Sequence, residues 1–170
     1  MNEYRLASEI KHLYGLVRCT ESLGLIYRRM SRNKDAVDVF QEGLGMLEDM
    51  DCTEAKRTET RMRMISYQAE CASRDIPFEQ AIGIFERYEA AVDSMAAMTG
   101  RMETFVNIKR EYWLLYSLYA DLYIRENMLA EARLMLAKAE KYAGNVVVEG
   151  DYAENSYLAT QAHYYRKTGN

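Results

Sequence analysis

The feature that most constrains the fold is a spacing of three or four residues between apolar positions, which recurs along almost the whole chain. This spacing places side chains on one face of an α-helix. The first stripe of this kind contains Leu6, Ile10, Leu13, Val17, Thr20, Gly24 and Tyr27. One proline and nine glycines leave few interruptions in 170 residues, which favours long helices over short strands. The pattern therefore predicts an all-α protein.

Breaks in the periodicity divide the chain into about seven predicted helices. The first three breaks contain residues that commonly cap or begin a helix, namely Asn33, Thr53 and Pro77. A single domain over residues 1–170 is expected. Its predicted parts are hairpins at 3–49, 53–98 and 101–143 and a half hairpin at 151–170.

The later breaks are less regular. The fourth helix is expected to stop near Gly100, the fifth at the sequence RENM (125–128) and the sixth at Gly144. The fifth stripe is expected to include Met102 and Phe105. The run NVVVE after Gly144 is the one β-like segment, and the sequence offers no second run to pair with it.

A longer pattern repeats across the predicted helices, with small, aromatic and large apolar residues at the same offsets. The first set is Leu23, Gly24, Tyr27, Ala36, Phe40 and Gly43. The second set is Gln68, Ala69, Ala72, Ala81, Phe85 and Tyr88, and the third is Tyr119, Ala120, Tyr123, Ala132, Leu136 and Ala139. A fourth set begins with Gln161, Ala162 and Tyr165 and reaches a turn at Gly169.

These positions resemble the tetratricopeptide repeat (TPR), a family of paired helices with a small residue at the helix crossing and an aromatic residue one turn later. The resemblance covers nearly the whole chain. It implies a right-handed superhelical stack of antiparallel hairpins, called an α-solenoid. The residues that it assigns to repeat packing are Gly24, Tyr27, Ala36, Phe40, Ala69, Ala81, Phe85, Ala120, Tyr123, Ala132, Leu136 and Ala162.

The repeat length departs from the family. The small crossing residues at positions 24, 69, 120 and 162 lie 45, 51 and 42 residues apart, whereas the usual TPR period is about 34 residues. A long-helix variant with irregular stacking is therefore expected. The chain also stops after the first helix of its last pair, which would leave an apolar stripe exposed. We expect it to be a fragment of a larger protein, similar in style to repeats in bacterial sensory and regulatory proteins.

In TPR proteins the first helices of successive hairpins line a concave groove. The same register here assigns to that groove Arg18, Glu21, Arg63, Tyr67, Glu70, Arg74, Asp121, Arg125, His163 and Arg166. A surface of arginine, tyrosine and carboxylate groups suits an extended peptide or a partner helix. The groove type that clamps the C-termini of chaperones is excluded, because its lysine and asparagine positions are occupied by Glu21, Leu25, Tyr67, Leu114 and Leu118.

No catalytic, metal-binding or cofactor-binding pattern is found in the sequence. The two histidines, His12 and His163, lie in the first and last predicted helices. Glu70 and Asp121 are single acidic residues of the kind that is usually solvated on a helix. The sequence EGLGM (42–46) has two glycines but no preceding strand, so it is no dinucleotide loop. We therefore expect no enzyme and no cofactor.

Charge and composition limit the remaining partners. A net charge of −4 argues against direct nucleic-acid binding. Arg28 and its basic neighbours Arg29, Arg32 and Lys34 are expected to face solvent at a helix end. The longest apolar run, from Tyr112 to Ala120, is too short to span a membrane. Three widely spaced cysteines favour reduced thiols and the cytoplasm, and the periplasm stays open.

The sequence leaves three functions open. The leading hypothesis is a non-enzymatic scaffold that binds a protein or peptide. The second is a homo-oligomerisation module that self-associates through the C-terminal helix, with Tyr157, Leu158, Gln161, Ala162, Tyr164 and Tyr165 in contact. The third is an all-α enzyme, which a deep pocket with convergent polar groups would favour.

Overall fold

The computed structural model describes residues 2–99, 108–143 and 152–169, and within them helices are joined by short turns. The seven helices are α1 (Asn2–Arg29), α2 (Asn33–Glu48), α3 (Glu54–Asp75), α4 (Phe78–Thr99), α5 (Ile108–Arg125), α6 (Leu129–Ala143) and α7 (Tyr152–Thr168). The described residues contain no strand, which confirms the all-α prediction for them. Met102, Phe105 and the NVVVE run lie outside the described residues.

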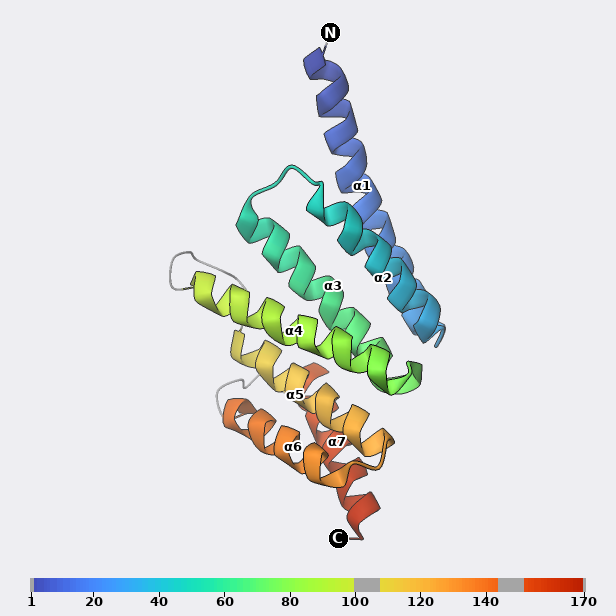
Figure 1. The fold of residues 1–170 in the computed structure, drawn as a ribbon, viewed down its shortest axis with the longest axis vertical. Helices are drawn as coiled ribbons and strands as arrows, with labels where there is room; N and C mark the ends of the chain where they lie inside the picture. Colours follow the sequence, from blue (N-terminus) through green and yellow to red (C-terminus); the bar gives the residue numbers. More distant parts are fainter. Residues whose placement is uncertain (1, 100–107, 144–151, 170) are drawn as a thin grey trace.

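Consecutive helices run in opposite directions and follow one another from the N-terminal to the C-terminal end of the molecule (Figure 1). Each helix packs against the next, from α1 on α2 to α6 on α7. Further contacts join α1 to α3, α3 to α5 and α5 to α7, so the odd-numbered helices also meet one another. These odd-numbered helices are the ones to which the sequence assigned the groove.

Most of the predicted small residues are buried, and one of them lies at a close approach of two helices. A Cβ atom on Gly24 would come within 2.5 Å of the Phe40 ring of α2, a distance that real side chains do not tolerate. Ala36, Ala69, Ala81, Ala120 and Ala132 are fully buried, as are Phe40 and Phe85. The ring of Phe85 lies 4.6 Å from that of Tyr119, measured between centroids. Ala162 differs from the other small residues because its side chain is exposed.

The turns after α1 and α5 have the same geometry. Ser31 and Asn127 adopt left-handed φ angles of 57° and 61°. In the first turn the Arg32 amide donates to the Tyr27 carbonyl at 2.9 Å, and in the second the Met128 amide donates to the Tyr123 carbonyl at 2.8 Å. This Schellman arrangement satisfies carbonyl groups that a helix end leaves without partners. The accepting carbonyls belong to Tyr27 and Tyr123, which occupy the same position in the sequence repeat.

The turn after α3 is built differently because of Pro77. In the repeat register Pro77 corresponds to Arg32 and Met128, but a proline has no amide hydrogen to donate. The carbonyl of Ala72 therefore lacks the local donor that Tyr27 and Tyr123 have. The Arg125 side chain, from the end of α5, donates to the Ala72 carbonyl at 3.1 Å and to the Ile76 carbonyl at 2.7 Å. A side chain from another helix thus replaces a missing backbone donor.

Two predicted capping residues behave differently from each other. The hydroxyl of Thr53 accepts a hydrogen bond from the Lys56 amide at 3.3 Å, as expected for an N-cap. Asn33 is not a cap, because α2 begins at Asn33 and Arg32 takes the cap position without a side-chain bond. The Asn33 side chain instead donates to the carboxylate of Asp75, at the end of α3. It therefore links two helix ends rather than closing its own helix.

Candidate functional site: a polar cavity between α3, α5 and α7

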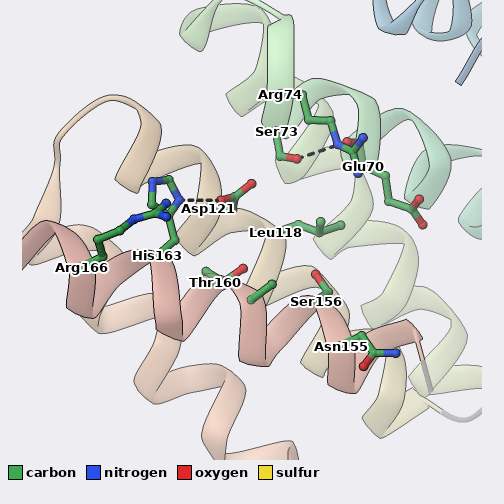
Figure 2. Close-up of a pocket in the computed structure, with 11 residues that line it drawn as sticks. Glu70, Ser73, Arg74, Leu118, Asp121, Asn155, Ser156, Thr160, His163 and Arg166 are labelled. Carbon is green, nitrogen blue, oxygen red and sulfur yellow. Dashed lines mark hydrogen bonds and ion pairs between the residues drawn. The ribbon is translucent and has the colours of Figure 1, made fainter. Parts of the chain in front are cut away.

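The candidate site is a cavity of about 400 Å³ between α3, α5 and α7. Its lining residues are Glu70, Ser73, Arg74, Leu118, Asp121, Asn155, Ser156, Ala159, Thr160, His163 and Arg166. Figure 2 shows the α3 residues on one side and the α7 residues on the other, with Leu118 and Asp121 of α5 between them. Of the ten residues that the sequence assigned to a groove, the cavity brings together five: Glu70, Arg74, Asp121, His163 and Arg166.

Helix α3 contributes a buried carboxylate and an exposed guanidinium group. Glu70 is only 6% exposed and forms an ion pair with Arg28 of α1. This corrects two expectations, since Glu70 is not solvated and Arg28 does not face open solvent. The Ser73 hydroxyl donates to the Glu70 carbonyl at 3.1 Å. Arg74 lies one turn after Glu70 and is exposed.

Helices α5 and α7 meet at the cavity through Asp121 and His163. The Nδ1 atom of His163 lies 3.4 Å from the Oδ1 atom of Asp121, and both side chains are about one-third exposed. Thr160, one turn before His163, is buried. Arg166, one turn after it, is exposed. Neither Arg74 nor Arg166 forms an ion pair with another side chain within the described part of the chain.

Several polar contacts between helices share one sequence separation. Arg63 of α3 donates to both carboxylate oxygens of Glu21 in α1, at 2.7 and 3.3 Å. The pairs Glu21–Arg63, Arg28–Glu70, Asn33–Asp75 and Asp121–His163 each join residues that are 42 positions apart. The fourth pair has the same separation as Ala120 and Ala162 in the sequence repeat. The same separation thus recurs at both ends of the molecule, whereas the Arg125 contacts from α5 to α3 span 53 and 49 positions.

The other expected groove residues take different places. Arg18 is exposed on α1, one turn before the Glu21–Arg63 pair. Tyr67 is half-buried, with its ring 5.6 Å from that of Phe40 and the Arg28 guanidinium 5.2 Å from its centroid. Arg125 is no groove residue in the expected sense, because its guanidinium group is bound to the end of α3.

Several lining residues were not predicted. Ser73 follows Glu70 by three positions, and Asn155, Ser156, Ala159 and Thr160 lie on the α7 face that also carries His163. The signal for them was helical spacing: positions 156, 160 and 163 are separated by one turn each and share a face.

The thiol nearest the site is unsuited to nucleophilic chemistry. Burial raises the pKa of Cys71, on α3, to about 12, so the thiol stays protonated at neutral pH. No hydroxyl among the described residues forms a hydrogen bond to the His163 ring, whose recorded partner is Asp121. The described residues also contain no group of three or more histidine, cysteine or acidic side chains that could hold a metal ion.

A second cavity, of about 470 Å³, lies between α6 and α7. It is lined by Arg133, Leu136, Ala137, Glu140, Tyr157, Gln161, Tyr164 and Tyr165. Of the residues expected to mediate self-association, Tyr157 is buried, while Leu158 and Tyr165 are 53% and 48% exposed. The expected contact stripe is thus divided between the interior of the molecule and its surface.

The described helices include none that is both long and apolar enough to cross a membrane. Comparison with protein-family models, with curated proteins and with solved structures gives no match.

Proposed function

We propose that this chain is a non-enzymatic scaffold of TPR-like helix pairs, which binds an extended peptide or a partner helix along its odd-numbered helices. The observation that carries the proposal is the cavity between α3, α5 and α7, in which five of the expected groove residues meet. Peptide-binding surfaces of this kind combine apolar side chains with a few charged anchors. Leu118 supplies the apolar contact, and Arg74 and Arg166 supply charged groups that no described side chain neutralises.

Two observations support the TPR-like part of the proposal. The turns after α1 and α5 share one hydrogen-bond pattern at equivalent repeat positions. Contacts between odd-numbered helices recur at a separation of 42 residues. Contacts between the first helices of successive pairs are expected when helix pairs follow one another as repeats, each contacting its neighbours. A right-handed superhelix is the arrangement that we propose for them.

A binding role is favoured over catalysis by the chemistry of the cavity. Asp121 and His163 face each other, but a Ser–His–Asp arrangement also needs a hydroxyl within hydrogen-bond reach of the imidazole. The cavity hydroxyls of Ser73 and Thr160 are not bound to that ring within the described residues. The one buried thiol on α3, Cys71, is protonated at neutral pH.

The test is to block the cavity without disturbing the core. Ala159 lines the cavity and is exposed, so Ala159→Trp would fill it from the surface. Ala162 is exposed on the same helix but is not among the lining residues, so Ala162→Trp is a matched control. We expect a displayed random-peptide library to yield a shared motif on the unaltered chain and on Ala162→Trp, and binding of that motif to be lost with Ala159→Trp. Peptides that bind Ala159→Trp unchanged would contradict this site.

A further inference from the structure

We propose that the partner held by this cavity is an acidic peptide segment, with carboxylate groups bound by Arg74 from α3 and Arg166 from α7. This inference rests on the proposed function and specifies the chemistry of the ligand. The arginine side chains are suited to it because a guanidinium group binds a carboxylate through two parallel hydrogen bonds.

The two buried carboxylates on α1 and α3 that lie nearest this surface are neutralised within the molecule. Glu21 is buried and bound by Arg63 through two hydrogen bonds. Glu70 is buried and paired with Arg28. A carboxylate that is buried against a guanidinium group contributes little net negative field to the surface above it. Asp121 is the acidic residue of the cavity that has no arginine partner among the described residues, and it lies beside His163.

The arginines of the same surface divide into two groups. Arg28 and Arg63 are used in the ion pairs with Glu70 and Glu21, and Arg125 is bound to the carbonyls at the end of α3. Arg74 and Arg166 line the cavity, are exposed and have no ion-pair partner in the described part of the chain. Because Arg28 neutralises Glu70, the two guanidinium groups face the single remaining carboxylate of Asp121, although the whole chain has a net charge of −4.

The extent of this surface favours a peptide over a small anion. The cavity volume of about 400 Å³ exceeds the space that one carboxylate group needs, and its hydroxyl groups and Leu118 can contact the backbone and stem of a bound segment. Beyond the cavity, Arg18 of α1 is also exposed and lies one turn before the Glu21–Arg63 pair that joins α1 to α3. A peptide that runs from α7 toward α1 would meet a further cation there.

The experiment compares a fluorescein-labelled, glutamate-rich peptide with the same peptide carrying glutamine in place of glutamate. Binding is measured by fluorescence anisotropy with the full chain at low and at physiological salt. We expect the glutamate peptide to bind at least about tenfold more tightly than the glutamine peptide, with a difference that narrows as salt rises. Arg74→Glu and Arg166→Glu should each weaken binding of the glutamate peptide by about tenfold or more.

Arg87→Glu is the matched control, because Arg87 is exposed on α4 and does not line the cavity. It changes the net charge by the same amount and should leave binding unaltered. Equal weakening by Arg87→Glu would mean non-specific attraction and would overturn the proposal. Circular dichroism of each variant shows whether the helices remain folded.

The remaining outcomes separate the ligand class from the proposed function. Equal binding of the two peptides, with both lost in Ala159→Trp, would overturn the acidic preference and leave the peptide site in place. The acidic preference would also be overturned if the chain binds library-selected peptides but does not bind the glutamate peptide at low salt. Free glutamate that displaces the labelled peptide at the same concentration as unlabelled peptide would assign the cavity to small carboxylates rather than to a peptide.

Discussion

At the scale of single residues, glycine and alanine positions decide how closely α1 and α2 approach. A Cβ atom on Gly24 would lie only 2.5, 2.6 and 2.8 Å from three atoms of the Phe40 ring. Phe40 is fully buried and also contacts Tyr67, so its ring has little freedom to move away. Gly15 lies on the same helix, and a Cβ atom there would have no atom within 4 Å.

We predict opposite effects for alanine at these two glycines. Alanine favours a helix over glycine by about 1 kcal/mol, so Gly15→Ala should raise the free energy of unfolding by up to that amount. Gly24→Ala should lower it by about 1–2 kcal/mol, because overpacking against Phe40 exceeds the gain in helix propensity. Urea unfolding followed by circular dichroism measures both. Adding Phe40→Leu to Gly24→Ala should recover part of the loss, and an unaltered stability for Gly24→Ala alone would refute the steric account.

At the scale of helices, the end of α3 depends on α5. The repeat places Pro77 where other turns have an amide donor, and Arg125 supplies the hydrogen bonds instead. An arginine that was expected to face a ligand is thereby fixed on backbone carbonyls. It also orients the end of α3 that carries Ser73 and Arg74, two residues of the cavity.

Replacement of Arg125 by methionine should therefore destabilise the junction between α3 and α5. The variant keeps most of the side-chain stem but leaves the Ala72 and Ile76 carbonyls without their donor, at a cost of about 1–3 kcal/mol in unfolding free energy. Hydrogen exchange should become faster at the end of α3. Arg87→Met, on the exposed face of α4, provides the comparison. If the two variants have equal stability, the Arg125 hydrogen bonds contribute nothing measurable.

At the scale of the whole molecule, burial of tyrosines in the core makes the stability of the fold depend on pH. The ring of Tyr88 is fully buried and its hydroxyl donates to Glu111 at 2.7 Å. Burial, followed by the nearby Glu111 carboxylate, raises the pKa of Tyr88 well above its ordinary value. Burial likewise raises the pKa of Tyr119, with Tyr123 as the next contribution. The folded state therefore retains phenolic protons that an unfolded chain would release.

This linkage predicts unfolding in alkaline solution. A tyrosine with a raised pKa in the folded state contributes its full stability below about pH 10, the ordinary tyrosine pKa, and that stability falls as the pH rises further. We expect the phenolate absorbance of the buried tyrosines to appear together with the loss of helical circular dichroism above that pH, after the exposed tyrosines have ionised. Tyr119→Phe removes a buried titrating group without breaking a described hydrogen bond, so the free energy of unfolding should fall less steeply with rising pH. Tyr14→Phe, at an exposed residue, should leave that slope unaltered. Ionisation of all fourteen tyrosines at about pH 10 in a fully helical protein would contradict the prediction.

The sequence by itself determined the helices and the faces that they bury. Apolar spacing located the described elements, and the repeat identified Gly24, Ala36, Ala69 and Phe40 as contact residues. These are local properties, because the face that a helix buries follows from the order of its own side chains. Half of the expected groove residues line the cavity, because helical spacing places them on the same faces of α3, α5 and α7.

Only the tertiary structure decided which polar groups meet. Arg28 is paired with Glu70 rather than solvated, Arg125 binds carbonyls 53 and 49 positions away, and the cavity is completed by hydroxyls of α7. These contacts depend on how far one helix is shifted along another. That shift is set by the packing of many side chains at once. A long arginine side chain can also reach several different acceptors for any one shift. Periodicity within one helix carries no information about this shift, so the sequence could indicate the surface of the site but not its bonds.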